Sequence, residues 1–173
     1  MADKTIVWLN GPSRNDLLDA FPIQKNEIGC NFIRRDRPVH HVVSFDQGMV
    51  QTNTEHMEQG VKYYTRDAWQ KVPWKLVPQW KTIDPQNSGM MAILLATKLS
   101  TDPIYILGLD WGITTDSVYE YPAGKSERKY TTGCKRQLKI LSEQFKITVV
   151  NDGVPDTDAP VIGKKAFLEK CNK

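Results

Sequence analysis

Residues 88–110 limit the fold of this chain most strongly, because a helix-like segment and a strand-like segment follow one another there and both are apolar on every side. The first, SGMMAILLATKLS, is apolar nearly all round, as a buried helix is, and Ser88 is expected to cap it. The second, PIYILGLD, is a continuous Ile and Leu run. A strand that is apolar on both faces is typical of a parallel sheet covered on both sides.

Similar short apolar strands recur along the chain and alternate with helix-like or polar stretches. This alternation predicts one α/β domain over residues 1–173, a Rossmann-like fold with a mostly parallel sheet and helices on both faces. Residues 67–87 hold three prolines and three tryptophans, and we expect an irregular segment packed by its aromatic rings. The other expected strands are residues 5–10, 28–33, 40–45, 61–66 and 147–152, and the other expected helices are residues 15–21, 49–60, 134–145 and 164–171.

The composition narrows the class of protein. The 173 residues are 40% hydrophobic and 25% charged with a net charge of +3, and the basic residues are mixed with acidic ones along the chain. This mild positive charge suits a small anionic ligand but gives no clustered basic face for a nucleic acid. No apolar run is long enough for a membrane span, and no secretory leader is evident. Three well-separated cysteines without metal-ligand spacing favour a cytoplasmic protein with reduced thiols and no metal site.

Small and polar residues gather where the predicted strands end, which is where open parallel sheets bind ligands. The first strand ends in Asn10-Gly11-Pro12-Ser13. Gly11 allows a tight turn and a close approach to a ligand, and Pro12 presets φ. Ser13 can cap the next helix, whose free N–H groups attract an anion. The Asn10 amide suits a base, a ribose hydroxyl or a phosphate oxygen. The alternative is a plain turn with an N-cap, and no G-x-G-x-x-G dinucleotide motif is present.

The motifs LNGPS, GCN, SFDQG, NSGMMAILLATKL and PIYILGLDWG, taken in this order, resemble those of the bacterial sialyltransferases that use CMP-sialic acid and of related Rossmann-like proteins. The resemblance touches most of the chain from Ile6 to Asp152. It implies a nucleotide or nucleotide-sugar ligand, of the CMP type first, and no other cofactor. The residues that match the nucleotide-binding positions are Asn10, Gly11, Pro12, Ser13, Asn31, Ser88, Gly89 and Trp111, and the catalytic candidates are Asp46, Asp110 and Tyr119.

The chain departs from the pattern of that family at the catalytic positions. Asp46 stands where the family more often has asparagine, and Gly112 stands where a tyrosine is expected, although Tyr119 and Tyr121 follow in the same loop. The stretch ERKYTTGCKRQ should hold the general-base histidine and has none.

The three histidines of the chain lie elsewhere. His40 and His41 begin a predicted strand, where alternation is expected to expose one ring and pack the other, and His56 is expected on the surface. None of them has metal-ligand spacing with another histidine or a cysteine.

Two functions therefore stay open. The first is a glycosyltransferase-like enzyme that binds a CMP- or UDP-linked sugar, with Asp46 or Asp110 as base or ribose ligand. Arg14, Arg34 or Lys129 would then offset the phosphate charge. The second is a nucleotide-binding or protein-interaction module that has kept the pocket and lost the chemistry, which the short chain and the missing histidine favour.

Overall fold

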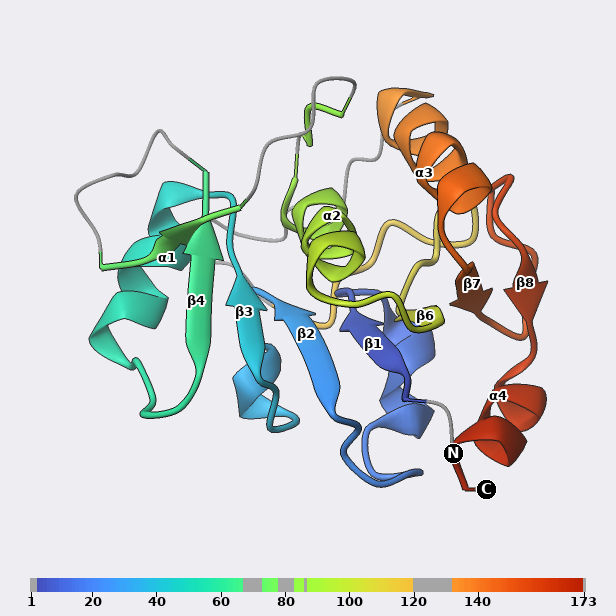
Figure 1. Ribbon diagram of the computed structural model, residues 1–173, viewed down its shortest axis with the longest axis horizontal. Helices are drawn as coiled ribbons and strands as arrows, with labels where there is room; N and C mark the ends of the chain where they lie inside the picture. Colours follow the sequence, from blue (N-terminus) through green and yellow to red (C-terminus); the bar gives the residue numbers. More distant parts are fainter. Residues whose placement is uncertain (1–2, 67–72, 78–82, 86, 120–131, 173) are drawn as a thin grey trace.

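The computed structural model describes residues 3–66, 73–77, 83–85, 87–119 and 132–172 (Figure 1). Its strands are β1 (Thr5–Trp8), β2 (Asn26–Cys30), β3 (His41–Val43), β4 (Lys62–Thr65), β5 (Lys75–Leu76), β6 (Ile104–Leu107), β7 (Ile147–Val150) and β8 (Val161–Ile162). Its α-helices are α1 (Gln47–Glu55), α2 (Ser88–Leu99), α3 (Thr132–Gln144) and α4 (Lys164–Cys171), and two 3-10 helices are η1 (Pro12–Leu17) and η2 (Ile33–Arg35).

The eight described strands form one parallel sheet in the order β5-β4-β3-β2-β1-β6-β7-β8. The chain moves outward from β1 to β5 and then returns to the other side of β1 at β6, so that the strand order reverses between β1 and β6. Trp8 lies opposite Leu107 in this pair, and the two strands end together. Their carboxyl ends mark the place where such sheets hold ligands. The predicted α/β class and parallel sheet are confirmed.

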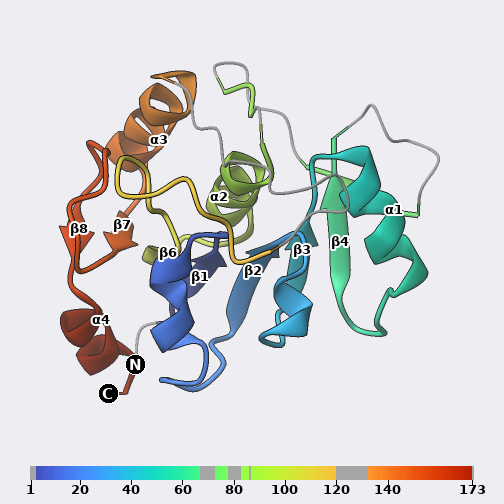
Figure 2. The same cartoon turned by 180° about the vertical axis from the view of Figure 1, so that it is seen from behind.

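Alternate residues of the central strands enter two separate cores, one on each face of the sheet. Val7 and Ile28 belong to the core that α2 and α3 cover. Ile6 and Trp8 belong to the core that η1, α1 and α4 cover. Figure 1 shows α2 in front of the sheet, and Figure 2 shows η1 in front of it from the opposite side. Helices therefore cover both faces, which explains why these strands are apolar on both sides.

The segment after β1 differs from its sequence prediction. It is the 3-10 helix η1, which begins at Pro12 with Gly11 as N-cap, and not an α-helix over 15–21 capped by Ser13. Pro12 fits the first helical position because its φ is preset and the missing N–H needs no partner there. The prediction of the α2 cap is also wrong, because Oδ1 of Asn87, and not Ser88, accepts the hydrogen bond from Met90 N at 2.9 Å.

Two edge strands and one short helix were not predicted. β5 and β8 have two residues each, which is too short for a periodic pattern. β5 lies in the segment expected to be irregular. The second predicted strand, over 28–33, instead ends at Cys30, and η2 follows it.

Several expectations for single side chains are confirmed. His40 is exposed and His41 is buried, with its ring centroid 5.7 Å from that of Tyr64. Trp74 is buried against Tyr63, while Trp69 and Trp80 lie outside the described residues. The cysteines are buried free thiols.

In the described part of the chain, no helix is long and apolar enough to cross a membrane.

A buried ion pair, which sequence reasoning missed, fixes the amino end of β2. Glu27 and Arg37 are 0% and 4% exposed, and Arg37 Nε and Nη2 donate to the two carboxylate oxygens at 2.7 and 2.8 Å. Trp8 Nε1 also donates to Glu27, at 2.8 Å. Arg37 donates further to the backbone oxygens of Leu18 and Phe21. This pair has the hydrogen bonds that a buried ion pair needs to be stable.

Candidate functional site at the carboxyl edge of the sheet

Most predicted site residues lie at the carboxyl edge of the sheet, in the turns that follow β1, β2, β3 and β6 and at the start of α2. They form separate hydrogen-bonded groups. One group joins Asp110 to the turn after β1, and another joins Asn31 to Ser88. A third joins Tyr119 to Arg14. The parallel sheet brings the predicted residues to one edge, and the paths of the turns determine which of them form hydrogen bonds with each other.

The Asp110 carboxylate forms hydrogen bonds that connect the ends of three neighbouring strands. Its side chain is 1% exposed. Oδ2 accepts a hydrogen bond from Ser13 N at 3.0 Å, and Oδ1 accepts one from Asn151 Nδ2 at 2.7 Å. Ser13 follows β1, Asp110 follows β6 and Asn151 follows β7. The protein's own carboxylate thus binds the backbone N–H that we expected to be free for a ligand anion.

The close packing of the turns after β1 and β6 explains why residue 11 is a glycine. Its N–H donates to the carbonyl oxygen of Gly108 at 3.0 Å. A Cβ on Gly11 would lie closer than 3.0 Å to both Gly108 O and the Asp110 carboxylate, which real Cβ atoms essentially never do. The close approach expected between Gly11 and a ligand is therefore, in this structure, an approach to the turn after β6.

Asn31 and Ser88 meet, although 57 positions separate them in the sequence. Ser88 Oγ donates to Asn31 Oδ1 at 2.9 Å and accepts from Phe45 N at 2.9 Å. Asn31 has a φ of 52°, a left-handed conformation that asparagine tolerates better than most residues. Its backbone oxygen accepts a hydrogen bond from Asn53 Nδ2 at 3.1 Å. These contacts hold the ends of β2 and β3 against the first turn of α2.

The other predicted residues have different surroundings. Asp46 is the N-cap residue of α1, and its exposed side chain makes no capping hydrogen bond. Gly89 is half-buried beside Leu9. The side chain of Trp111 is buried in the core under α2 and α3. The backbone oxygen of Asn10 accepts a hydrogen bond from Val118 N at 2.9 Å.

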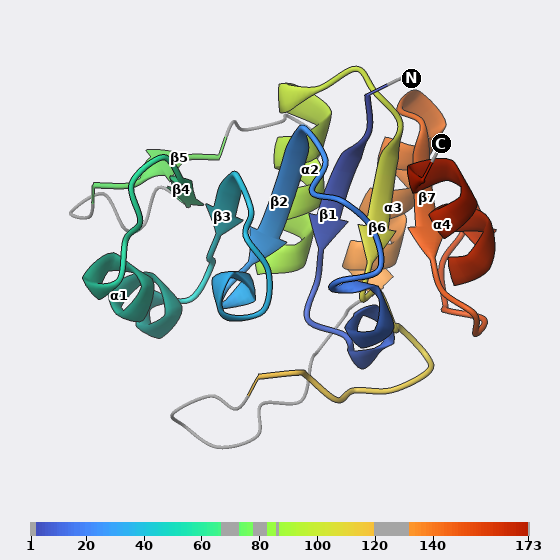
Figure 3. The same cartoon turned by 90° about the horizontal axis from the view of Figure 1, so that it is seen from below.

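Arg14, Asp36 and Tyr119 form a compact polar group beside the end of β1. Arg14 is 0% exposed, and its Nη2 donates to Asp36 Oδ2 at 2.5 Å and to the Tyr119 hydroxyl oxygen at 2.7 Å. The Tyr119 hydroxyl donates to the same Asp36 oxygen at 2.9 Å. The segment after β6 brings Tyr119 to this position by passing beside η1 (Figure 3). Asp36 was not predicted, because nothing in the local sequence distinguishes it from a surface residue.

Burial keeps two weakly acidic groups near Arg14, the Tyr119 hydroxyl and the Cys30 thiol, protonated. It raises the pKa of Tyr119, against the lowering effect of the Arg14 charge, so the hydroxyl stays a neutral donor. It also raises the pKa of Cys30 to about 12, again against Arg14. Cys30 is therefore a thiol at neutral pH and no nucleophile.

The Arg14 guanidinium has unused hydrogen-bonding capacity. Among the described residues, its Nε and Nη1 have no hydrogen-bond partner, and neither has the buried Oγ of the neighbouring Ser13. Arg37, which is as deeply buried, uses Nε and both Nη atoms. Because a buried charge is costly unless its donors are bonded, the charge of Arg37 is better compensated than that of Arg14.

The remaining cationic and aromatic candidates are Arg34, Tyr121 and Lys129. Arg34 forms an ion pair with Glu58. Tyr121 and Lys129 lie outside the described residues. Over the part of the chain that the structure describes, no group of three or more His, Cys, Asp or Glu side chains could hold a metal ion.

No family model, curated protein or solved structure matches this chain. The fold and the geometry around Arg14 are thus the basis for a functional proposal, and the resemblance to sialyltransferases stays a prediction.

Proposed function

We propose that this protein binds a small anionic ligand of the nucleotide or nucleotide-sugar type at the carboxyl edge of its sheet, with Arg14 as the cation that holds the anionic group. The observation that carries the proposal is the fully buried Arg14 guanidinium, whose Nε and Nη1 have no partner among the described residues. It lies beside the carboxyl end of β1, next to the point where the strand order reverses.

The physical reason is the cost of an incompletely bonded charge. A buried guanidinium gives up its hydration, and the ion pair with Asp36 replaces that hydration at one nitrogen only. These N–H groups are enclosed in the ligand-free structure, so a phosphate must displace the chain that covers them, and it would then gain a charge-assisted hydrogen bond for each of them. The unpartnered Ser13 hydroxyl adds a neutral donor in the next position.

Two amides at the same edge of the sheet are candidates for contacts to the rest of a nucleotide, and of these Asn31 already has its Oδ1 bonded by Ser88 Oγ. Asn10 and Asn31 follow β1 and β2, the strands that flank the Arg14 group. Carboxamides can donate to and accept from the edges of a base or the hydroxyls of a ribose. A CMP-type ligand is the first choice because it is the ligand that the motif order implies.

Sugar transfer is a second candidate function, and the exposed Asp46 favours it. Of the catalytic candidates, Asp110 has both carboxylate oxygens engaged, and the Tyr119 hydroxyl is bonded between Arg14 and Asp36. Asp46 keeps an exposed carboxylate at the end of β3. If transfer occurs, Asp46→Asn should lower turnover by about 10²–10⁴-fold, while His40, His41 and His56 should be replaceable.

The proposal is tested by ligand binding. A thermal-shift panel of CMP, CDP, UMP, UDP, AMP, GMP and their sugars should show stabilisation, about 2.7 kcal/mol at 100 times the dissociation constant. Calorimetric titration with the selected nucleotide should then show that Arg14→Met weakens binding at least tenfold. Arg136→Met removes the same charge from an exposed position on α3 and should leave binding unchanged. Equal affinity of Arg14→Met and the wild type would refute the assignment.

A stability control keeps this test interpretable. Arg14→Met leaves behind Asp36, whose side chain is 28% exposed and can be hydrated, so we expect a small loss of unfolding free energy. Arg37→Met leaves Glu27 buried and unpaired, and should cost about 3–5 kcal/mol. Urea unfolding of both variants measures this difference. An equal, large loss in both would mean that Arg14 is also a structural residue.

A further inference from the structure

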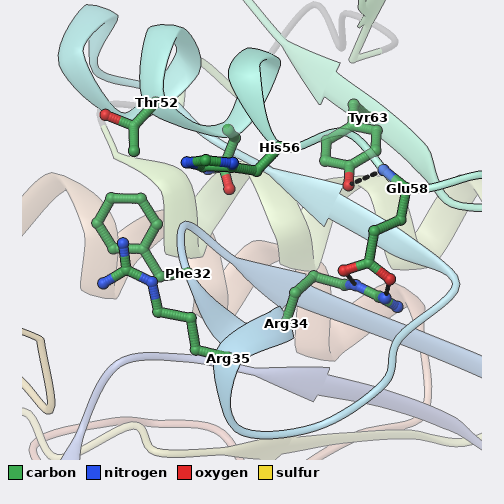
Figure 4. A pocket seen from close by; sticks show the side chains of 8 residues that line it. Phe32, Arg34, Arg35, Thr52, His56, Glu58 and Tyr63 are labelled. Atoms are coloured by element: carbon green, nitrogen blue, oxygen red, sulfur yellow. Dashed lines mark hydrogen bonds and ion pairs between the residues drawn. The ribbon is translucent and has the colours of Figure 1, made fainter.

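A separate cavity of about 160 Å³ lies between α1, η2 and β4 (Figure 4). It is lined by Phe32, Arg34, Arg35, Thr52, Asn53, His56, Glu58 and Tyr63. One water molecule needs a cavity volume of only ~10–15 Å³, so this cavity has room for a small molecule of several heavy atoms.

The charges that line this cavity do not cancel. Arg34 forms an ion pair with Glu58, in which Arg34 Nε donates to Glu58 Oε1 at 2.8 Å. Arg35 has no ion pair in the described part of the chain, and its guanidinium stacks over Phe32 with 4.0 Å from Cζ to the ring centroid. The stacked ring fixes the plane of the guanidinium and leaves its N–H groups at the edge for a ligand. The cavity therefore has one unbalanced positive charge.

Two further hydrogen-bond donors, Tyr63 and His56, complete the lining. The Tyr63 hydroxyl oxygen accepts a hydrogen bond from Glu58 N at 3.1 Å, and its own hydrogen can be donated. Burial raises the pKa of Tyr63, against the nearby Arg34 charge, so the hydroxyl is protonated at neutral pH. Figure 4 shows His56 between the Phe32–Arg35 pair and the Tyr63–Glu58 pair. An imidazole ring supplies a further N–H donor.

One feature of the cavity opposes an anion. The last turn of α1 ends at Glu55, and the C-terminus of a helix carries a partial negative charge of about half a unit. The full charge of Arg35 is larger than this partial charge. The Arg34–Glu58 pair contributes no net charge as long as both partners are ionised.

We propose that this cavity binds a phosphate-type oxyanion, with Arg35 as the cation and Tyr63 and His56 as further hydrogen-bond donors. The rings of Phe32 and Tyr63 line the cavity and provide a wall for the organic part of a phosphorylated molecule. This site adjoins the group around Arg14, because Phe32 packs edge-on against Tyr119 with ring centroids 5.7 Å apart. The proposal does not depend on the function proposed for that group.

The test uses inorganic phosphate and phenyl phosphate in calorimetric titrations of the full chain. Wild type should bind phosphate, and Arg35→Gln should weaken binding about tenfold or more. Glu58→Gln releases Arg34 from its partner and should tighten binding several-fold. Arg136→Gln, a matched change of an exposed arginine on α3, should have no effect. Tighter binding of phenyl phosphate than of phosphate identifies a phosphorylated organic ligand, while equal binding identifies free phosphate.

Unchanged phosphate binding in Arg35→Gln, or unchanged or weaker binding in Glu58→Gln, would overturn the proposal, as would a wild-type protein that binds neither probe. Arg14→Met should leave the Arg35-dependent part of phosphate binding intact, and Arg35→Gln should leave the Arg14-dependent part of nucleotide binding intact. These cross-checks separate a failure of this proposal from a failure of the proposed nucleotide function.

Discussion

At the scale of single residues, burial changes the chemistry of side chains that look alike in the sequence. Arg14 and Arg37 are both buried arginines, yet only Arg37 has its charge matched by a buried carboxylate with a full set of hydrogen bonds. His40 and His41 are neighbours, and only His41 is buried. These differences separate the fully paired arginine from the one for which we propose a ligand, and the buried histidine from the exposed one.

His41 should make the protein less stable in mild acid. Burial, with smaller effects from Lys62, His40 and Lys75, lowers its pKa from 6.5 to about 4. Between these values the unfolded chain binds a proton that the folded chain does not. The stabilising contribution is therefore complete above about pH 6.5 and is lost as the pH falls toward 4, by up to about 2–3 kcal/mol.

Urea unfolding between pH 4 and 7.5 measures this effect. His41→Gln cannot take up the proton, so its unfolding free energy should change less with pH than that of the wild type. His56→Gln changes an exposed histidine and should keep the wild-type slope. An identical slope for His41→Gln and the wild type would contradict the assignment.

At the scale of elements, the turns after β1 and β6 behave as one packed unit. We expect Gly11→Ala to destabilise the ligand-free protein by about 2–4 kcal/mol, because the added Cβ meets Gly108 O and the Asp110 carboxylate. Gly48→Ala is the matched control. A Cβ on Gly48 meets nothing within 4 Å, and alanine in α1 should stabilise the protein by about 0.5–1 kcal/mol. Thermal unfolding of both variants without ligand is the measurement. If Gly11→Ala lost no stability relative to the wild type, the two turns would have room to move apart and the packing argument would be wrong.

At the scale of the whole molecule, α4 shares one core with β1 and β6. Phe167 of α4 is 0% exposed and packs against Tyr105 and Phe21, with ring centroids 5.3 and 5.1 Å apart. Phe167→Ala should therefore cost about 3–5 kcal/mol. If the chain is one cooperative domain, tryptophan fluorescence and far-UV circular dichroism should report the same shifted transition. Separate transitions would mean that α4 unfolds independently of the sheet.

The sequence by itself determined the class of fold. Strands apolar on both faces, as in residues 5–8 and 104–107, require a sheet covered on both sides, and the structure has that sheet. The polar residues at strand ends were also placed on the correct edge, because parallel strands bring their carboxyl ends together. Local periodicity was enough for both, since it reports burial along a single segment.

Only the tertiary structure decided which of those residues meet. Asp110 reaches Ser13 across 97 positions, and Tyr119 reaches Arg14 across 105. Such contacts depend on the path of turns that have no repeating pattern, so the sequence did not reveal that Asp110 holds the turn after β1 or that Asp36 pairs with Arg14. The cavity beside Arg35 could not be predicted from the sequence either. Its walls come from η2, α1 and β4, and they form a cavity only when the folded sheet brings these segments together.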